Sequence, residues 1–242
     1  MSKIPVLEIF GPTIQGEGMV VGRKTMFVRT AGCDYSCAWC DSAFTWDGSA
    51  KEDIRLMTSE EIWLQLQAIG GRQFDHVTIS GGNPALLSSL DNCIDLFQEN
   101  GIEVALETQG TRYQDWFVKI NDLTISPKPP SSNMKTDWRK LDYIIDQLAQ
   151  HGRLAYTSLK VVVFDREDLL YAEKVHKRYP EVSFFLQVGN DDLTEIEPQQ
   201  LSRHLLNRYE WLIDQVVASE SLNHVRVLPQ VHALVWGNKR GV

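Results

Sequence analysis

Residues 25–42 read TMFVRTAGCDYSCAWCDS, a short apolar run that passes into a loop with three cysteines. The run at 25–29 combines β-branched and aromatic residues, which predicts a strand. Cys33, Cys37 and Cys40 fall within eight residues, just beyond the end of that strand. This order, an apolar strand followed by a chemically distinctive loop, recurs along the chain.

Five further apolar runs predict strands at 76–80, 102–108, 123–126, 159–164 and 183–188. Several are continuous runs of Val, Ile, Leu and Phe, as expected of parallel strands that are covered on both faces. Amphipathic helical patterns lie between them, with a capping box at Thr58 and Glu61, a C-terminal Gly101 and an N-cap at Asp165. Six strand-then-helix units predict an α/β fold with a parallel sheet and right-handed crossovers. Because about eight units close a full barrel, six predict an open or partial (β/α)6 barrel.

Composition and charge narrow the classes to which the chain can belong. The 242 residues are 43% hydrophobic and 23% charged, which is typical of a globular protein, and no linker-like stretch divides them. The net charge of −8 argues against a protein that coats nucleic acid, because phosphate binding needs clustered cations. No apolar run approaches the roughly 20 residues of a membrane span, and the first residues do not resemble a signal peptide. We therefore expect one cytoplasmic domain over residues 1–242, with neither a membrane nor a nucleic acid as its partner.

In such a sheet, reactive groups are expected in the loops after the carboxyl ends of the strands. The unusual residues of this chain fall there. They are the three cysteines, Ser80-Gly81-Gly82-Asn83-Pro84, Glu107-Thr108-Gln109-Gly110, Ser126-Pro127-Lys128, and Gln187. The sequence therefore predicts its chemistry at this end of the sheet.

The cysteine loop offers three soft thiolates for a metal. A structural zinc site usually has four ligands, but the fourth cysteine, Cys93, lies on an apolar helical face and is expected to be buried. An iron–sulfur cluster also takes thiolate ligands, and three cysteines on a four-iron cluster leave one iron open. Zinc, a cluster, and three cysteines along one helix all remain open at this point, although Gly32 and Asp34 make a helix poor.

The spacing Cys-x3-Cys-x2-Cys, with Trp39 before the last cysteine, resembles the signature of the radical S-adenosylmethionine enzymes. The segment at 80–84 resembles their Gly-Gly-Glu-Pro motif, with Asn83 in place of the usual Glu. The resemblance implies a [4Fe-4S] cluster and S-adenosylmethionine as cofactors, with an electron donor such as flavodoxin or ferredoxin. The residues that it assigns to the cofactor are Trp39, Cys40, Asp41, Gly82, Glu107, Gln109, Ser126, Pro127, Lys128 and Gln187.

Within that superfamily, Gln15-Gly16-Glu17-Gly18 resembles the opening of the 7-carboxy-7-deazaguanine synthases, the QueE family. The resemblance continues through the cysteine loop and 107–111 to a late Gln230-Val231-His232, so it covers nearly the whole chain. It implies that 6-carboxy-5,6,7,8-tetrahydropterin rearranges to 7-carboxy-7-deazaguanine with loss of ammonia, in a homodimer that needs Mg²⁺ at Ser42. An N-terminal loop (about 5–24) and a C-terminal tail (about 223–242) would cover the substrate. The implied substrate contacts are Ile14, Gln15, Glu17, Arg29, Ser80, His232 and Val242.

Two other functions stay open on the sequence alone. One is another radical enzyme, such as a glycyl-radical activase that acts on a protein. The other, from a different class, is a zinc-stabilised binding module. The 15–18 loop argues against the first, and the absence of a second cysteine pair argues against the second.

Overall fold

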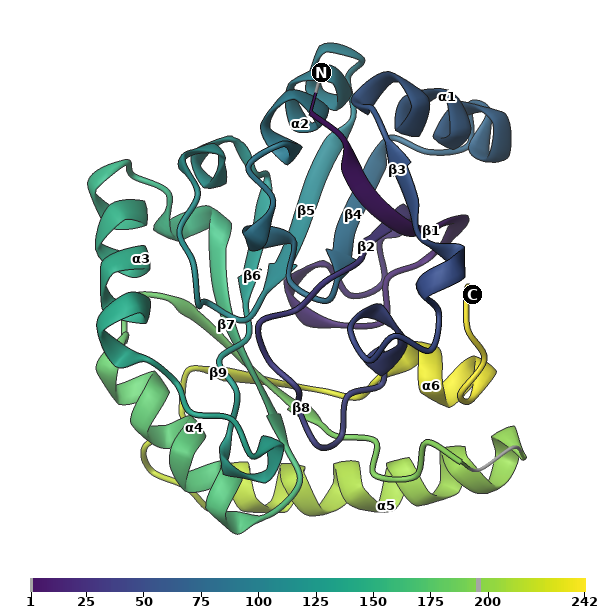
Figure 1. Cartoon of the computed structure of the whole chain (residues 1–242). Helices are drawn as coiled ribbons and strands as arrows, with labels where there is room; N and C mark the ends of the chain where they lie inside the picture. The colour runs from purple at the N-terminus through teal and green to yellow at the C-terminus, as the bar shows by residue number, and fades with distance from the viewer. Residues whose placement is uncertain (1, 195–196) are drawn as a thin grey trace.

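The structure, a computed structural model, describes residues 2–194 and 197–242. Within these residues the chain forms one sheet of nine strands, in the order β3-β1-β2-β4-β5-β6-β7-β8-β9 (Figure 1). The strands are β1 (Ile4–Ile14), β2 (Lys24–Thr30), β3 (Arg55–Met57), β4 (His76–Gly81), β5 (Glu103–Thr108), β6 (Asp122–Ile125), β7 (Thr157–Val163), β8 (Ser183–Val188) and β9 (Val225–Leu228).

The pairing of the strands confirms the predicted parallel sheet. Each neighbouring pair from β2 to β9 is parallel, whereas β1 pairs antiparallel with β2 on one side and with β3 on the other. Strands β3 and β9 are the two ends of the strand order, so the sheet does not close on itself. It is a partial barrel, as the number of strand-then-helix units predicts.

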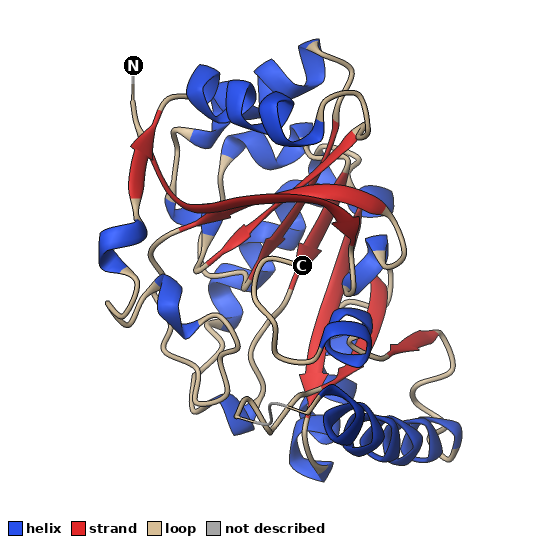
Figure 2. Cartoon of the chain, turned by 90° about the vertical axis from the view of Figure 1, so that its right-hand side faces the viewer, coloured by secondary structure: helices blue, strands red, loops and turns tan. Residues whose placement is uncertain are grey.

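Helices surround the curved sheet (Figure 2). They are α1 (Ser59–Gly70), α2 (Leu90–Glu99), α3 (Trp138–Gln150), α4 (Arg166–Arg178), α5 (Pro198–Val217) and α6 (Val231–Trp236). Two start signals in the sequence are confirmed. Thr58 and Glu61 form a reciprocal capping box at α1, and Asp165 accepts a hydrogen bond from the Asp168 N–H at the start of α4.

The N-terminal segment differs from its prediction. Residues 5–24 were expected to form a loop, but β1 extends from Ile4 to Ile14, and only the residues beyond it turn back toward β2. The sequence conceals this strand because Gly11 and Pro12 are turn signals. The strand accommodates them through a shift of its register with β2 between Phe10 and Thr13.

Two further parts of the fold also differ from what the sequence predicts. The expected tail at 223–242 contains a seventh parallel strand, β9, and the short helix α6. The connection from β5 to β6 carries a 3-10 helix, η5 (Asp115–Lys119), where the alternation predicts an α-helix. The connection is short, and Trp116 and Phe117 bury their rings in the core within it.

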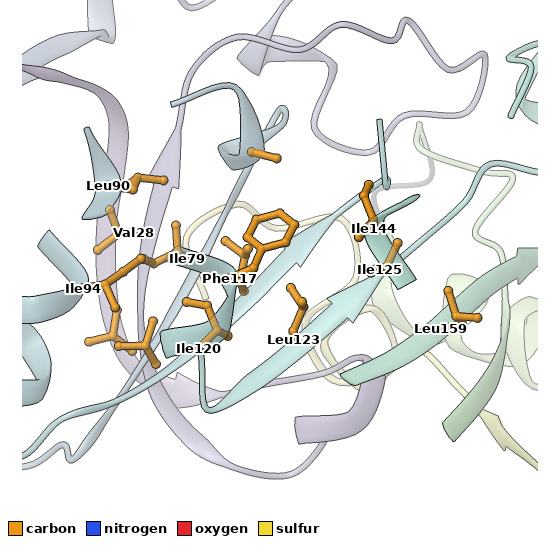
Figure 3. Close-up of a cluster of buried hydrophobic side chains, with 14 of the residues drawn as sticks. Val28, Ile79, Leu90, Ile94, Phe117, Ile120, Leu123, Ile125, Ile144 and Leu159 are labelled. Carbon is orange, nitrogen blue, oxygen red and sulfur yellow. The ribbon is translucent and has the colours of Figure 1, made fainter. Parts of the chain in front are cut away.

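Successive residues of each parallel strand point to opposite faces of the sheet. One set is apolar and packs against the helices: Figure 3 shows Val28 and Ile79 beside Ile94 of α2, and Ile125 beside Ile144 of α3. The alternate set carries polar and charged side chains toward the inside of the barrel. It includes Arg29 of β2, Ser80 of β4, Glu107 of β5, Thr124 of β6 and Lys160 of β7. In the described chain, no helix combines the length and the apolar character that crossing a membrane requires.

A buried histidine lies near the opposite ends of these strands. His76, at the start of β4, is fully buried, and its Nδ1 lies 2.8 Å from the Thr25 hydroxyl. Its Nε2 is buried without a hydrogen-bond partner among the described residues. Burial, together with the nearby positive charge of Arg23, lowers the pKa of His76 to about 4.

We predict that His76 makes folding sensitive to mild acid. Because its pKa is lower in the folded chain than in the unfolded one, its contribution to stability is complete above about pH 6.5 and is lost as the pH falls toward 4. From pH 6.5 to 5, wild type should lose about 2 kcal/mol of unfolding free energy relative to His76→Gln, at about 1.4 kcal/mol per pH unit. Urea unfolding of both proteins across this range measures the difference, and a difference that does not change with pH would contradict the prediction.

Candidate active site

A cavity of about 430 Å³ opens where the parallel strands end. Its wall combines the end of β1, the cysteine loop, the carboxyl ends of β4, β5 and β6, and the last residues of the chain. A smaller cavity of about 100 Å³ shares part of this wall. Segments from both ends of the chain and from its middle therefore meet in one place.

The three clustered cysteines line the main cavity. Cys33, Cys37 and Cys40 are each partly buried. Burial raises the pKa of all three thiols, and that of Cys37 reaches about 11. The thiols are therefore protonated at neutral pH unless a metal displaces the protons. N–H groups lie 3.4 Å from two of the sulfurs: Tyr35 N and Gln109 Nε2 from Cys33 Sγ, and Trp46 Nε1 from Cys40 Sγ.

The separation of the sulfurs distinguishes the two metal hypotheses. Zinc–sulfur bonds of about 2.3 Å in a tetrahedral site bring thiolates to about 4 Å from one another. Among the described residues, Glu17, Asp41 and His232 have ligand atoms that all lie within 4.8 Å of one another, whereas the three cysteines do not form such a group. The sulfurs are thus spread more widely than a single zinc ion requires. This spread favours an iron–sulfur cluster, whose thiolate ligands bind separate corners.

The segment at 131–135 holds the cysteine loop in place. The Tyr35 hydroxyl donates to the Lys135 carbonyl at 2.8 Å, and the Ala38 N–H donates to the Ser132 carbonyl at 3.0 Å. The indole N–H of Trp39 donates to the Ser131 hydroxyl at 2.9 Å. The loop therefore keeps its shape through contacts that do not involve the cysteines.

The glycines after β4 allow two loops to approach closely. A Cβ on Gly81 would lie 2.2 Å from the Thr30 carbonyl oxygen, and a Cβ on Gly82 would lie 2.1 Å from the Gly32 carbonyl oxygen. Neither position therefore tolerates a larger residue. The sequence predicts that these glycines admit a ligand, and in the structure they also seat the β4 loop against the cysteine loop.

Asn83 has a role that the sequence did not reveal. Its side chain is buried, with Nδ2 donating to Asp34 and Thr111, and Oδ1 accepting from Thr108 and the Ala85 N–H. Every hydrogen-bonding position of the amide is filled. A Glu at this position could not donate to Asp34, so Asn83 serves here to join the cysteine loop to the ends of β4 and β5.

A buried cation lies between two carboxylates inside the barrel. Lys160 is 1% exposed, and its Nζ lies 2.6 Å from Glu17 Oε2 and also in contact with Glu107. Gln230 donates to the other oxygen of Glu17 at 2.8 Å. Burial alone would raise the pKa of Glu17, but the charges of Lys160 and His232 and the hydrogen bonds from Lys160 and Gln230 together outweigh it and hold that pKa at about 2. Glu17 is therefore an ionised acceptor at the cavity wall.

The glycines that flank Glu17 make this arrangement possible. A Cβ on Gly16 would lie 2.6 Å from His232 Nδ1, and the Gly16 carbonyl accepts from the Val231 N–H at 3.1 Å. Gly18 has a φ of +64° and packs against Thr124 of β6. The sequence Gly-Glu-Gly thus lets the loop enter the barrel while the C-terminal segment packs on it.

The C-terminal residues form a further part of the wall of the main cavity. Residues 237–242 line the main cavity, including Val242 at the end of the chain. Arg240 pairs with Glu8 of β1, and its guanidinium lies 3.8 Å from the centre of the Phe44 ring. Asn238 accepts a hydrogen bond from Asn190 at 2.8 Å. The chain end is therefore attached to both sides of the cavity.

Arg29 and Ser42 lie together beneath this chain end. Arg29 Nη1 donates to the Ser42 hydroxyl at 2.8 Å, and Ser42 in turn donates to Asp41 at 3.0 Å. Arg29 Nε also lies 2.9 Å from Glu8, so its charge is partly balanced within the protein. These side chains form a polar corner of the cavity. Arg29 brings a positive charge to it, and Ser42 and Asp41 bring oxygen atoms that can bind a metal ion.

Comparison with known proteins gives a consistent result. Residues 27–126 match the radical SAM superfamily. The chain is 65% identical over its full length to the 7-carboxy-7-deazaguanine synthase of Bacillus cereus, with all of both chains covered. It is 67% identical to that of Bacillus subtilis over 239 residues, 99% of this chain and 98% of the relative. The chain belongs to the 7-carboxy-7-deazaguanine synthase family. Radical SAM enzymes use a [4Fe-4S] cluster and S-adenosylmethionine.

Solved structures agree with the fold of this family member. The crystal structure of QueE from Escherichia coli superposes with a TM-score of 0.68 at 22% identity, covering 95% of each chain. SuiB from Streptococcus suis, bound to its precursor peptide SuiA, gives a TM-score of 0.55 at 12% identity over 86% of this chain and 49% of its own. At these identities the likeness concerns the fold alone.

The structure brings most of the predicted site residues of this family member to the main cavity. In addition to the cysteines, the lining includes Ile14, Gln15, Glu17, Arg29, Trp39, Asp41, Ser42, Ser80, Gly82, Glu107, Gln109, Ser126, Lys128, His232 and Val242. Pro127 and Gln187 are not among the residues that line either cavity. Gln187 is fully buried on β8, and neither polar atom of its side chain has a hydrogen-bond partner in the described chain.

Sequence reasoning missed Lys160 and the tie between Gln230 and Glu17. Lys160 lies in an otherwise apolar strand, LKVVV, and a lone polar residue at an inward position of such a strand is the signal that could have revealed it. The bond from Gln230 to Glu17 joins residues 213 positions apart, so no local pattern indicates it.

We predict that Lys160→Met destabilises this family member by about 3–5 kcal/mol, because it leaves Glu17 buried without its cation. The double variant Lys160→Met/Glu17→Gln should recover part of the loss, since it removes one of the two carboxylates that lose their cation. Urea unfolding at pH 7 measures both. A loss below about 1 kcal/mol, or a double variant no more stable than the single one, would contradict the role assigned to the pair.

Proposed function

We propose that this chain is a 7-carboxy-7-deazaguanine synthase that converts 6-carboxy-5,6,7,8-tetrahydropterin to 7-carboxy-7-deazaguanine with loss of ammonia, a carbon–nitrogen lyase reaction. The observation that carries the proposal is the meeting of two features in one cavity. The three cysteines line one part of the wall, and the ionised Glu17 of the Gln-Gly-Glu-Gly loop lines another. Full-length identity of 65–67% to synthases from two Bacillus species supports the same activity.

The cysteine loop fits the cofactors of the family. Its three thiols are partly buried and are not all within 4.8 Å of one another, and N–H groups that stabilise thiolate sulfur lie near Cys33 and Cys40. Lys128, at the end of β6, is a cation suited to the carboxylate of S-adenosylmethionine, and it also lines the cavity. When bound, the cluster and S-adenosylmethionine supply radical chemistry that begins with removal of a hydrogen atom from the substrate.

The protein's own residues bind and orient the pterin. A carboxylate that stays ionised accepts hydrogen bonds from adjacent N–H donors, so Glu17 suits the donor-rich pyrimidine edge. Gln15 lies next to it, with its side-chain oxygen 3.2 Å from the Glu17 N–H. Arg29 can pair with the substrate carboxylate through N–H groups beyond those that face Glu8 and Ser42. These contacts would hold the ring in one orientation and exclude water from it.

Mg²⁺ is proposed to bind in the polar corner formed by Ser42 and its neighbours. Magnesium takes a few protein oxygens and fills its shell with substrate oxygens and water. The Ser42 hydroxyl and the Asp41 carboxylate lie together, next to the cation that we assign to the substrate carboxylate. A homodimer, an electron donor such as flavodoxin or ferredoxin, and action in the cytoplasm are carried over as part of the same proposal from the family resemblance.

The activity test uses the cysteines. Cys33→Ala, Cys37→Ala and Cys40→Ala, each reconstituted with iron and sulfide without oxygen, should lose most bound iron and all turnover of the pterin. Cys93→Ala is the control, because Cys93 is buried in the core on α2 and lines neither cavity. It should keep its iron and its turnover at a cost of about 1 kcal/mol in stability. A fully active Cys37→Ala enzyme would overturn the radical mechanism.

A second test concerns the chain end. The Val242 carboxylate offers two acceptor oxygens and a fixed negative charge to the 2-amino edge of the pterin, with His232 on the adjoining wall. Three residues added after Val242 should raise the KM for the pterin about tenfold or more, the equivalent of one charge-assisted hydrogen bond. Iron content and cleavage of S-adenosylmethionine without substrate should stay unchanged. Normal substrate binding by the extended enzyme would exclude the chain end from the site.

A further inference from the structure

A carboxylate outside the described site is buried and fully engaged. Asp168, in the first turn of α4, is 0% exposed. Its Oδ1 accepts from the Ser131 N–H at 3.0 Å, and its Oδ2 accepts from the Ser131 hydroxyl at 2.6 Å and from the Phe164 N–H at 2.9 Å. Three donors from two separate loops thus converge on one buried charge, and a buried charge without such donors would be costly.

The first of these loops leads directly to an aromatic ring at the site. The Ser131 hydroxyl, which donates to Asp168, accepts the indole N–H of Trp39 at 2.9 Å. Trp39 lies between Cys37 and Cys40 in the sequence and lines both cavities. A chain of two hydrogen bonds therefore connects the buried carboxylate to the ring next to the cysteine sulfurs.

The second loop positions another ring against the first. Phe164 follows β7, and its ring centre lies 4.8 Å from that of Trp39. Its N–H is held by Asp168, and its carbonyl accepts from Arg208 of α5 at 2.7 Å. A Cβ on Gly189 would lie 2.2 Å from the ring, so the space behind Phe164 is already filled. Asp168 therefore fixes two adjoining aromatic side chains, one through its indole N–H and one through its backbone.

These two rings, with Val162 and Asn190, line one side of the smaller cavity of about 100 Å³, whose other lining residues are polar or charged and include Lys128, Glu107 and the Glu17–Lys160 pair. Aromatic faces with polar groups beside them suit a flat heterocycle with ring nitrogens. The adenine of S-adenosylmethionine is such a group. Because Trp39 is adjacent in sequence to Cys40, a molecule bound at the cysteine loop can bring its ring to this wall.

We propose that Asp168 is a positioning residue for S-adenosylmethionine, which sets the orientation of Trp39 and Phe164 so that they receive the adenine. This inference rests on the proposed function, since it requires that the cysteine loop binds this cofactor. Asp168 itself lines neither cavity. It acts through Ser131 and the backbone of Phe164.

The test compares Asp168→Asn with a matched variant on the same helix. An Asn amide cannot accept from all three donors, because its NH₂ group would face an N–H or O–H group. Asp165 caps α4 through the Asp168 N–H, so Asp165→Ala loses a helix cap without removing an acceptor from Ser131 or Phe164. Titration of the anaerobic, cluster-loaded enzymes with S-adenosylmethionine gives the Kd of each.

Asp168→Asn should raise the Kd for S-adenosylmethionine about tenfold, the equivalent of one lost hydrogen bond to a charged group. Its iron content and its KM for the pterin should match wild type, and Asp165→Ala should leave the Kd unchanged. Ser131→Ala should raise the Kd less, because the contact to Phe164 survives. In a Trp39→Phe background, which lacks the indole N–H, Ser131→Ala should have no further effect.

Several results would overturn the inference. They are an unchanged Kd in Asp168→Asn, an equal rise in Asp165→Ala, or a rise in the pterin KM in place of the cofactor Kd. If Asp168→Asn fails to fold or to hold iron, Ser131→Ala measured in wild type and in the Trp39→Phe background decides the question. Additive effects of these two substitutions on the Kd would refute the inference. If wild type with its cluster does not bind S-adenosylmethionine, the proposed function itself fails.

Discussion

The placement of Lys160 inside the barrel is the constraint on which the site depends. A carboxylate cannot remain ionised in a buried setting without a nearby cation or several donors, and Lys160 provides that cation to Glu17 and Glu107 together. Since Glu17 belongs to the N-terminal loop and is also held by Gln230, the same charge secures both ends of the chain to the sheet. The pair is thus both a structural joint and the source of an ionised acceptor in the cavity.

Most of the fold could be predicted because its signals are local. The six expected strands are present, since runs of buried apolar residues and helix caps such as Thr58 act over a few positions. Strand β1 was missed because Gly11 and Pro12 are turn residues, and only its pairing with β2 on one side and β3 on the other makes it a strand. Strand β9 was missed for a related reason: it is four residues long and follows a loop, so its identity depends on pairing with β8.

The site residues also divide into those that local sequence patterns reveal and those whose role depends on distant partners. The cysteines, Glu17 and the strand-end residues could be found because their types and spacing are unusual in a short stretch. The functions of Asn83 and Lys160 could not, because each depends on partners that only the folded chain supplies: Asp34 and Thr108 for one, Glu17 and Glu107 for the other. Sequence patterns identify groups that do chemistry more readily than the groups that hold them in place.

The meeting of the two chain ends at the cavity has a consequence for biosynthesis. A chain emerging from the ribosome presents its cysteine loop early, and the sheet up to β8 can pair before the end of the chain exists. Gln230 and Arg240, the partners of Glu17 and Glu8, are synthesised only after β9, the last strand of the described sheet. A chain that stops short could therefore acquire much of the fold and all three cysteines while its cavity stays open to water.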